Sequence, residues 1–359
     1  MKKITNLEMG SIVYFLIRAY FIGLTFNVLL TAAKQDNWLC IILGVILGFI
    51  PLLMFFYIFN YEPDLNLNEK NIKLFGKIFG NIINILLALF TFFLIITIFS
   101  NLITFIHSDY LSRTPTLLIG ITFLIAVFYS VSKGFNSISR SCLVLFYISL
   151  ILVLISNIGL LFQVDITNFK PILFSKTNLV NGTYSYISYN VLPLYLINII
   201  PKNKIEKNNK TIKTIIIFYL IASLTLFLVI FNIIGIFGVK LARLYQYPEF
   251  QILKHVSLVG LSARLDSILF TQWIFDLLIF IIIGLYYIVS TTHMFIKEKK
   301  NICLFIYSAI LMFFSELITN NIFINLISLK FLPHVISITI TIIFILIYFK
   351  IKYAKKVKN

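Results

Sequence analysis

Long apolar segments recur along this 359-residue chain and constrain its fold more than any other feature. Many run for about 20 residues, the length an α-helix needs to cross a hydrocarbon layer of about 30 Å. The hydrophobic share of 60% and the charged share of 12% also differ from soluble domains, which are about half apolar and about a quarter charged. The pattern predicts an all-α polytopic membrane protein and excludes a secreted disulfide scaffold, a disordered chain and a cytosolic enzyme.

We predict about ten transmembrane helices in a single integral membrane domain covering residues 1–359. The predicted spans are 9–32, 39–59, 78–106, 115–132, 141–164, 183–200, 212–238, 268–293, 302–320 and 333–350. The first apolar run, of about 23 residues, is too long for the core of a signal peptide, so we expect it to remain as a helix. The segment 239–267 becomes an outer loop, and the spacing of its apolar residues predicts a short interfacial helix within it.

The excess of positive charge orients these spans. The 30 lysines and arginines outnumber the 13 acidic residues and give a net charge of +17. In a membrane protein such an excess is expected in the loops that face the cytoplasm and anionic lipid, so we predict no nucleic-acid partner. An even number of spans with cytoplasmic termini places the lysine-rich segments 202–213 and 350–358 inside. These lysines are explained as topology signals or, alternatively, as a contact for the acidic surface of a partner.

Two predicted spans carry helix-breaking residues near their middle. The sixth contains Asn190, Leu192 and Pro193, and a proline there removes a backbone hydrogen bond. The first contains the sequence Arg18-Ala19-Tyr20, followed by Gly23. Two broken helices in corresponding positions of two five-helix halves are typical of transporters with inverted repeats, in which the breaks line a central binding site. We therefore predict these seven residues as substrate-binding, with kinks in purely structural helices as the alternative.

A series of short motifs along the whole chain resembles that of the endospore germination permeases, the membrane B subunits of GerA-type nutrient germinant receptors. The matching residues are Asp36 and Trp38 after the first span, Pro115 opening the fourth, Gly134 and Arg140 before the fifth, Pro201 after the sixth, and Tyr247, Pro248, Arg264, Asp266 and Trp273 around the eighth. The chain departs from the family pattern at Asn136 and Ala263, where the family usually has acidic residues.

The resemblance implies a fold and a function. The family is similar to the amino acid–polyamine–organocation transporters, which implies a LeuT-like fold of five plus five helices with a small-molecule site between the first and sixth. It also implies a nutrient ligand, for which we expect an amino acid, partner subunits of the A and C types, and a location in the spore inner membrane. Arg264 and Asp266 would fix the outer loop against the eighth span rather than bind ligand.

Arg18 is the residue hardest to reconcile with a bilayer. A charged side chain at mid-span costs at least about 2.5–3.5 kcal/mol, so it should face protein or water and have a partner. Asp276 in the eighth span lies within about 6 Å of Arg18 in depth, counted at 1.5 Å per residue. We predict a charge pair, which in a LeuT-like arrangement would occupy the position of a bound cation. The alternatives are a snorkelling arginine and a purely structural pair.

Other polar residues have two explanations each. Tyr20 would either stack on or hydrogen-bond a ligand, or only pack in the core. Glu316 would either be solvated at the end of the ninth span or take part in proton transfer. The chain contains no hydrolase, metalloprotease, P-loop or kinase signature and no metal-ligand spacing, so we predict neither an enzyme nor a cofactor.

Three functions are consistent with these features. The first is a receptor that binds a small nutrient and changes conformation to signal germination through partner subunits. The second is a secondary active amino acid transporter that works by alternating access. The third is a membrane scaffold for the other receptor subunits that transports nothing.

Overall fold

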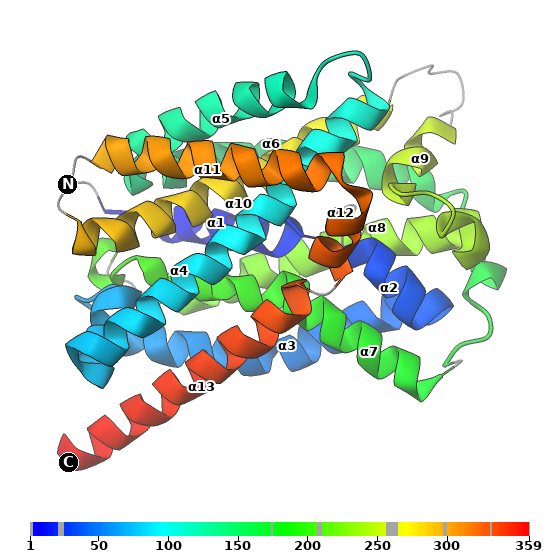
Figure 1. The fold of residues 1–359 in the computed structure, drawn as a ribbon. Helices are drawn as coiled ribbons and strands as arrows, with labels where there is room; N and C mark the ends of the chain where they lie inside the picture. The colour runs from blue at the N-terminus through cyan, green and yellow to red at the C-terminus, as the bar shows by residue number, and fades with distance from the viewer. Residues whose placement is uncertain are drawn as a thin grey trace.

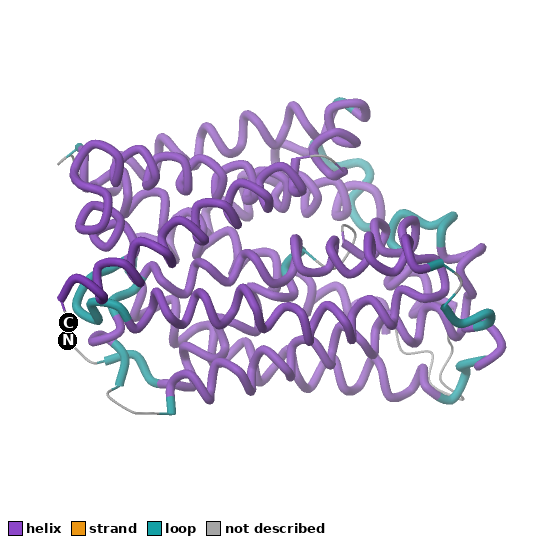
Figure 2. The backbone as a smooth tube through the Cα atoms, turned by 90° about the horizontal axis from the view of Figure 1, so that it is seen from below, coloured by secondary structure: helices purple, strands orange, loops and turns teal. Residues whose placement is uncertain are grey.

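The computed structural model describes residues 3–20, 25–173, 175–206, 210–255, 265–296, 300–330 and 332–358. Within these ranges the regular structure is helical apart from one parallel β-bridge between Ile4 and Ile205. The helices run roughly along one direction, and their connections gather at the two ends of the bundle (Figures 1 and 2). The described chain is an all-α bundle, as the apolar segments predicted.

The elements of the first half are α1 (Asn6–Arg18), α2 (Phe26–Ala33), η2 (Lys34–Asp36), α3 (Asn37–Asn60), α4 (Leu67–Asp109), α5 (Thr116–Ser132) and α6 (Phe135–Leu161). The second half contains η3 (Ile166–Phe169), α7 (Lys176–Tyr186), the π-helical turn η4 (Ile187–Val191), the 3₁₀ segments η5 (Leu192–Ile199) and η6 (Lys202–Lys204), α8 (Thr211–Ala242), α9 (Pro248–His255), α10 (Leu265–Phe295), α11 (Lys300–Asn320), α12 (Ile322–Lys330) and α13 (Leu332–Lys358).

By length and composition, seven helical segments of the described chain could cross a membrane. The other three predicted spans fall short for separate reasons. The first is divided into α1 and α2, the sixth changes from α-helix to π and 3₁₀ geometry, and the fourth, α5, has 17 residues. The start of α1 and the end of α13 lie at the same end of the bundle, which we call the N-terminal end (Figures 1 and 2). The end near α9 is called the opposite end.

Local sequence signals explain where several helices begin. Thr5 and Glu8 form a capping box at the start of α1: the Glu8 amide donates to Thr5 Oγ1 over 3.2 Å, and the Thr5 amide donates to Glu8 Oε2 over 2.9 Å. Gly134 begins α6 with φ of +83°, a conformation that residues with a Cβ rarely adopt. Gly76, with φ of +79°, bends α4 at the start of the predicted third span.

The sixth span begins at Lys176, earlier than the predicted start at residue 183, because the Ser175 side chain accepts a hydrogen bond from the Asn178 amide over 3.4 Å. This helix packs against α3 through small residues. A Cβ on Gly48 would lie 3.0 Å from a Val191 methyl group, and a Cβ on Gly182 would lie 2.5 Å from the Cys40 sulfur. The broken sixth helix is therefore held close to α3 along its length.

Two short helices lie at the ends of the main spans. The helix predicted within 239–267 is α9, with Pro248 as its first residue, where the missing amide removes no hydrogen bond. Its residues Phe250, Ile252 and Leu253 are buried, so α9 packs on the bundle. The helix α12, between the two last spans, was not predicted.

Candidate functional site

Arg18 ends α1 in the interior of the bundle and is fully buried. Its Nε lies 3.1 Å from Asp276 Oδ2 and 3.3 Å from Oδ1, and Nη1 donates to Thr225 Oγ1 on α8. The guanidinium carbon lies 5.1 Å from the ring centre of Tyr14, one turn earlier in α1. The structure thus brings together the two charges that the depth calculation paired, and it adds a hydroxyl from a third helix.

The close contact of the pair offsets part of the cost of burying two charges. Each ion loses its hydration, and only close opposite charge and further hydrogen bonds can offset that loss. The positive charge also lies at the C-terminal end of α1, where the helix dipole favours a cation. Among the described residues, one guanidinium nitrogen, Nη2, is buried without a hydrogen-bond partner. Arg18 therefore connects α1, α8 and α10 and retains one donor that none of the described residues accepts.

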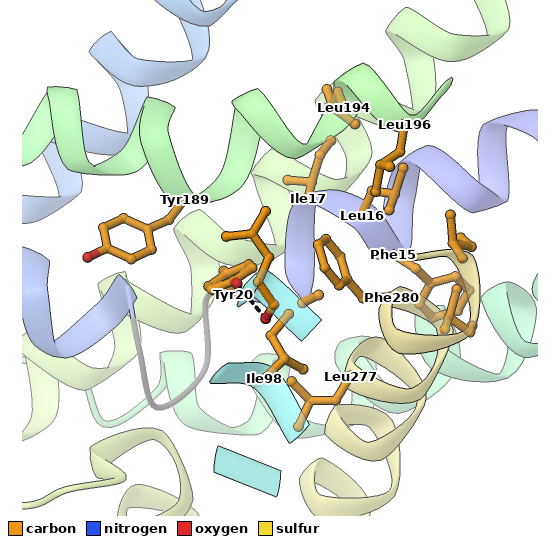
Figure 3. Close-up of a cluster of buried hydrophobic side chains, with 14 of the residues drawn as sticks. Phe15, Leu16, Ile17, Tyr20, Ile98, Tyr189, Leu194, Leu196, Leu277 and Phe280 are labelled. Carbon is orange, nitrogen blue, oxygen red and sulfur yellow. Dashed lines mark hydrogen bonds between the residues drawn. The ribbon is translucent and has the colours of Figure 1, made fainter. Parts of the chain in front are cut away.

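The break after Arg18 is stabilised by Tyr20 and Thr25. The Tyr20 carbonyl accepts hydrogen bonds from the Thr25 amide over 2.9 Å and from Thr25 Oγ1 over 2.8 Å. The Tyr20 hydroxyl donates to the Leu94 carbonyl on α4 over 2.7 Å (Figure 3). Its ring lies against Phe280 of α10 and Tyr189 of the sixth span. Tyr20 thus packs in the core and connects the first break to α4.

Asn190 connects the break in the sixth span to the break in the first. It lies in the π-helical turn η4, and its Nδ2 donates to the Ile17 carbonyl in the last turn of α1 over 2.7 Å. The carbonyl oxygen of the same side chain, Oδ1, is buried and has no hydrogen-bond partner among the described residues. Pro193 follows in η5, and the missing proline amide accounts for the loss of regular α-helical bonding in this region.

The predicted substrate residues therefore converge only in part. Arg18, Ala19, Tyr20 and Asn190 are buried around the two breaks, and Asn190 contacts the chain at the residue before Arg18. Leu192 and Pro193 are buried in η5. Gly23 lies outside the described residues.

Sequence reasoning missed Thr225 and Ser149. Thr225 lies on α8, inside a predicted span, and besides bonding Arg18 it donates to the Ala222 carbonyl over 2.7 Å. The Ser149 hydroxyl on α6 lies 3.2 Å from the hydroxyl of Tyr14, and the ring of Tyr14 lies beside the Arg18 guanidinium. A hydroxyl within an apolar span was the available signal, but such hydroxyls are common because they can bond the carbonyl of their own helix.

At the N-terminal end of the bundle, the segment that follows the sixth span holds two others together. We call residues 201–206 the strap. The Ile4 amide donates to the Lys204 carbonyl over 3.0 Å, and the Glu206 amide donates to the Ile4 carbonyl over 2.9 Å. Lys202 Nζ donates to Asn60 Oδ1 over 2.6 Å at the end of α3. The strap therefore joins the start of the first span to the end of the second.

Lys70 provides a second connection at this end. It lies in the first turns of α4, before the bend at Gly76, and is fully buried. Its Nζ donates to the carbonyls of Ile58 over 2.9 Å and of Phe59 over 3.2 Å. These are carbonyls at the C-terminal end of α3, where helix bonding ends and a cation is favourable.

At the opposite end, aromatic rings surround Phe105 of α4. Its ring centre lies 4.2 Å from that of Trp273, 4.7 Å from that of Tyr247 and 5.2 Å from that of Phe250. We call these rings, with Tyr110 and Phe270, the aromatic cluster. Two of its members, Tyr247 and Trp273, are residues of the family motif, so this part of the motif packs α9 against α4 and α10.

The remaining motif residues have local roles. The Asp36 carboxylate accepts the Leu173 amide over 2.8 Å, and Trp38 packs edge-on against Phe169. Pro115 precedes the first turn of α5, Pro201 precedes η6, and Arg140 is exposed on α6. Arg264 and the side chain of Asp266 lie outside the described residues. Among the residues that are described, no group of histidine, cysteine and acidic side chains could hold a metal ion.

Comparison with known proteins gives the family. The model of a family described as "Spore germination protein" matches residues 9–324, which is most of the chain. The chain belongs to this family. It is 24% identical over 284 residues to the spore germination protein YndE of Bacillus subtilis (strain 168), covering 76% of this chain and 75% of YndE. It is 25% identical over 279 residues to the spore germination protein XB of Bacillus anthracis, covering 76% of each protein.

A solved structure supports the fold of this family member. A Na⁺-coupled sialic acid symporter in a substrate-bound, outward-open state superposes with a TM-score of 0.59 and 12% sequence identity. The match covers 90% of this chain and 76% of the symporter. The chain is thus an integral membrane protein with the LeuT-like plan of five plus five helices, in which the first and sixth are broken.

Proposed function

We propose that this chain is the membrane subunit of a spore germinant receptor. It senses a small nutrient in a permease-like pocket and signals germination through partner subunits of the A and C types. Family membership supports the role in germination, and the LeuT-like plan supports a small-molecule site at the broken helices. Family membership supports a location in the spore inner membrane, and the lysine-rich connections support cytoplasmic termini.

The buried polar atoms at the two breaks support an amino acid as the nutrient, and they are the observation that carries this proposal. Within the part of the chain that the structure describes, Arg18 Nη2 is a charged donor without a partner, and Asn190 Oδ1 is an acceptor without a partner. Buried polar groups are usually hydrogen-bonded, so two such atoms at the two connected helix breaks favour a ligand that completes them. An amino acid carries a carboxylate that suits the guanidinium and an ammonium that suits the amide oxygen.

Signalling would use the contacts that connect the breaks to the bundle. A ligand that bonds Arg18 or Asn190 changes the Asn190–Ile17 contact and so the position of α1. Because the strap bonds Ile4 ahead of α1, a shift of α1 is transmitted to the N-terminal end, where partner subunits would detect it. The ligand must bind the two bundle conformations with different affinity, since only that difference can move the equilibrium.

A secondary active amino acid transporter is the second candidate. The matched symporter couples sialic acid to Na⁺, and the same bundle plan allows alternating access. The Arg18–Asp276 pair favours a receptor or an ion-independent carrier, because a guanidinium next to Asp276 supplies the positive charge that a coupled cation would bring. A scaffold without ligand is the third candidate, supported by the dense packing of Tyr20.

The test combines genetics with reconstitution. Spores of the source organism that lack this chain should lose germination with at least one amino acid offered singly, and a plasmid-borne copy should restore it. The purified protein in proteoliposomes should bind that radiolabelled amino acid without accumulating it. Accumulation would show a transporter, and absence of binding would show a scaffold. Spores that respond normally to every amino acid, with sister receptors also deleted, would exclude the receptor.

A further inference from the structure

A groove on the side of the bundle lies between α5, α6 and α10, and its lining includes none of the residues at the two helix breaks. Its volume is about 290 Å³. Its walls come from three helices: Ala126, Tyr129, Ser130, Lys133, Ser137, Ile138, Ser141, Cys142, Leu145, Phe275, Leu278, Ile279 and Ile282. The groove is open, and it belongs neither to the Arg18–Asp276 site nor to the aromatic cluster.

The lining of the groove changes from polar to apolar along its length. At the N-terminal end of the bundle it begins with Lys133, Ser137 and Ser141 around the turn between α5 and α6. Toward the middle of the spans it continues with apolar side chains such as Leu145 and Phe275. From Ser137 to Leu145 along α6 the groove extends about 12 Å at 1.5 Å per residue. A ligand that fits has a polar end at the membrane surface and an apolar end within the bilayer.

The charge of the polar end selects the headgroup. Lys133 is exposed, its Nζ lies 4.9 Å from the Tyr129 ring centre, and no ion pair with a carboxylate is found for it among the described residues. The groove lining includes no acidic residue. Lys133 directly precedes Gly134, at the start of α6, where the positive end of the helix dipole also favours an anion.

We propose that this groove binds one anionic phospholipid of the surrounding membrane. Its phosphate contacts Lys133 and the neighbouring serine hydroxyls, and one acyl chain lies along Leu145, Phe275 and Leu278. Because Phe275 is adjacent in sequence to Asp276, the bound acyl chain lies against the helix that carries the carboxylate of the buried charge pair. The lipid is therefore part of the packing that supports α10.

Native mass spectrometry of the purified full-length protein, mixed with phosphatidylglycerol or phosphatidylcholine in detergent, tests the proposal. The wild type should retain one phosphatidylglycerol at least five-fold more strongly than phosphatidylcholine. Lys133→Ala should reduce this retention about five-fold, which corresponds to about 1 kcal/mol for one lysine at a membrane surface. Ser141→Phe should block the groove and abolish retention of the single lipid. Glycerol 3-phosphate at millimolar concentration should not displace it.

Matched variants outside the groove control the experiment. Lys77→Ala removes another exposed lysine at the N-terminal end, and Val144→Phe enlarges a side chain on α6 that is 60% exposed. Both should retain phosphatidylglycerol as the wild type does. Equal retention of the two lipids, normal retention by Ser141→Phe, or displacement by glycerol 3-phosphate would each overturn the proposal, the last by showing a site for a free phosphate compound.

Discussion

At the N-terminal end of the bundle, the strap and Lys70 join distant segments through hydrogen bonds, whereas the contact of α9 with α4 and α10 at the opposite end centres on aromatic rings. The strap bonds Ile4 and Asn60, and Lys70 bonds the last carbonyls of α3. The aromatic cluster holds α9, α4 and α10 through ring contacts around Phe105. Between the two ends lies the buried pair of Arg18 and Asp276.

The difference teaches how such a bundle could move. Hydrogen bonds have preferred directions and distances, so the N-terminal end is either bonded or open. Aromatic packing tolerates several ring arrangements, so the opposite end can rearrange with smaller changes in energy. We therefore expect the N-terminal end to switch between a bonded and an open state. We expect the aromatic cluster at the opposite end to change its ring arrangement gradually.

Asp276→Asn should have the largest effect. It leaves the Arg18 charge buried without its counter-ion, which costs about 3–5 kcal/mol for a buried pair. The thermal midpoint of the purified protein measures the loss. Asp109→Asn is the control. Asp109 Oδ1 lies 3.6 Å from Nζ of the partly exposed Lys254. Exposed ion pairs of this kind contribute about 1 kcal/mol or less to stability. Equal loss in both variants would contradict the central role of the buried pair.

Phe105→Leu should weaken the opposite end by about 1–2 kcal/mol, because it removes ring–ring contacts while keeping an apolar side chain. Hydrogen exchange of amides in α9 should accelerate, and that of Ile4 should not change. Phe313→Ala on α11, which is 62% exposed, should leave both regions as in the wild type. Faster exchange at Ile4 in Phe105→Leu would show that the two ends are not independent.

Glu206→Pro should open the strap. It removes the amide that donates to the Ile4 carbonyl, a loss of about 1 kcal/mol, equivalent to about five-fold faster exchange at the Ile4 amide. Glu206→Ala keeps that amide and is the matched control. If both variants exchange at the same rate, the β-bridge does not hold this end closed.

The smallest effect concerns Asp165 at the start of η3. Hydrogen bonds from the Thr167 hydroxyl and amide lower the pKa of this carboxyl below its usual value. The stabilisation is present above the unfolded pKa and is lost as the pH falls through the lower, folded pKa. Thr167→Val should raise the pKa toward the ordinary value while the amide bond remains. Carbon-13 NMR of the Asp165 carboxyl measures the shift, and an unchanged pKa would exclude the hydroxyl as its cause.

The sequence allowed the helical plan and one central contact to be predicted. Apolar length located the spans, and because helices rise by a constant amount per residue, depth alone paired Arg18 with Asp276. Depth does not show in which direction a side chain points around its helix axis. Contacts that depend on this direction could therefore not be predicted. Thr225 is one hydroxyl among several in apolar spans, and the Asn190–Ile17 bond requires the π-helical turn that η4 forms.

The β-bridge between Ile4 and Ile205 was also beyond prediction. Neither segment has the alternation of a strand, and the bridge is two hydrogen bonds between the ends of different spans. The helix that leads into the sixth span begins at Lys176, before the predicted span, and its first turns contain polar residues that a hydropathy pattern excludes. Both differences arise from loops and helix ends, where backbone bonding rather than burial decides the structure.

Amino acid binding to a variant that lacks the central charges but keeps its fold tests the account most directly. In Arg18→Met with Asp276→Leu, apolar side chains replace the pair, an exchange that is often neutral or stabilising. Equilibrium dialysis of purified wild type and variant against a mixture of the common amino acids, read by mass spectrometry, compares their binding. The account predicts that the wild type retains at least one amino acid and that the folded variant binds it at least ten-fold more weakly. Equal retention by both proteins would contradict a nutrient site at Arg18.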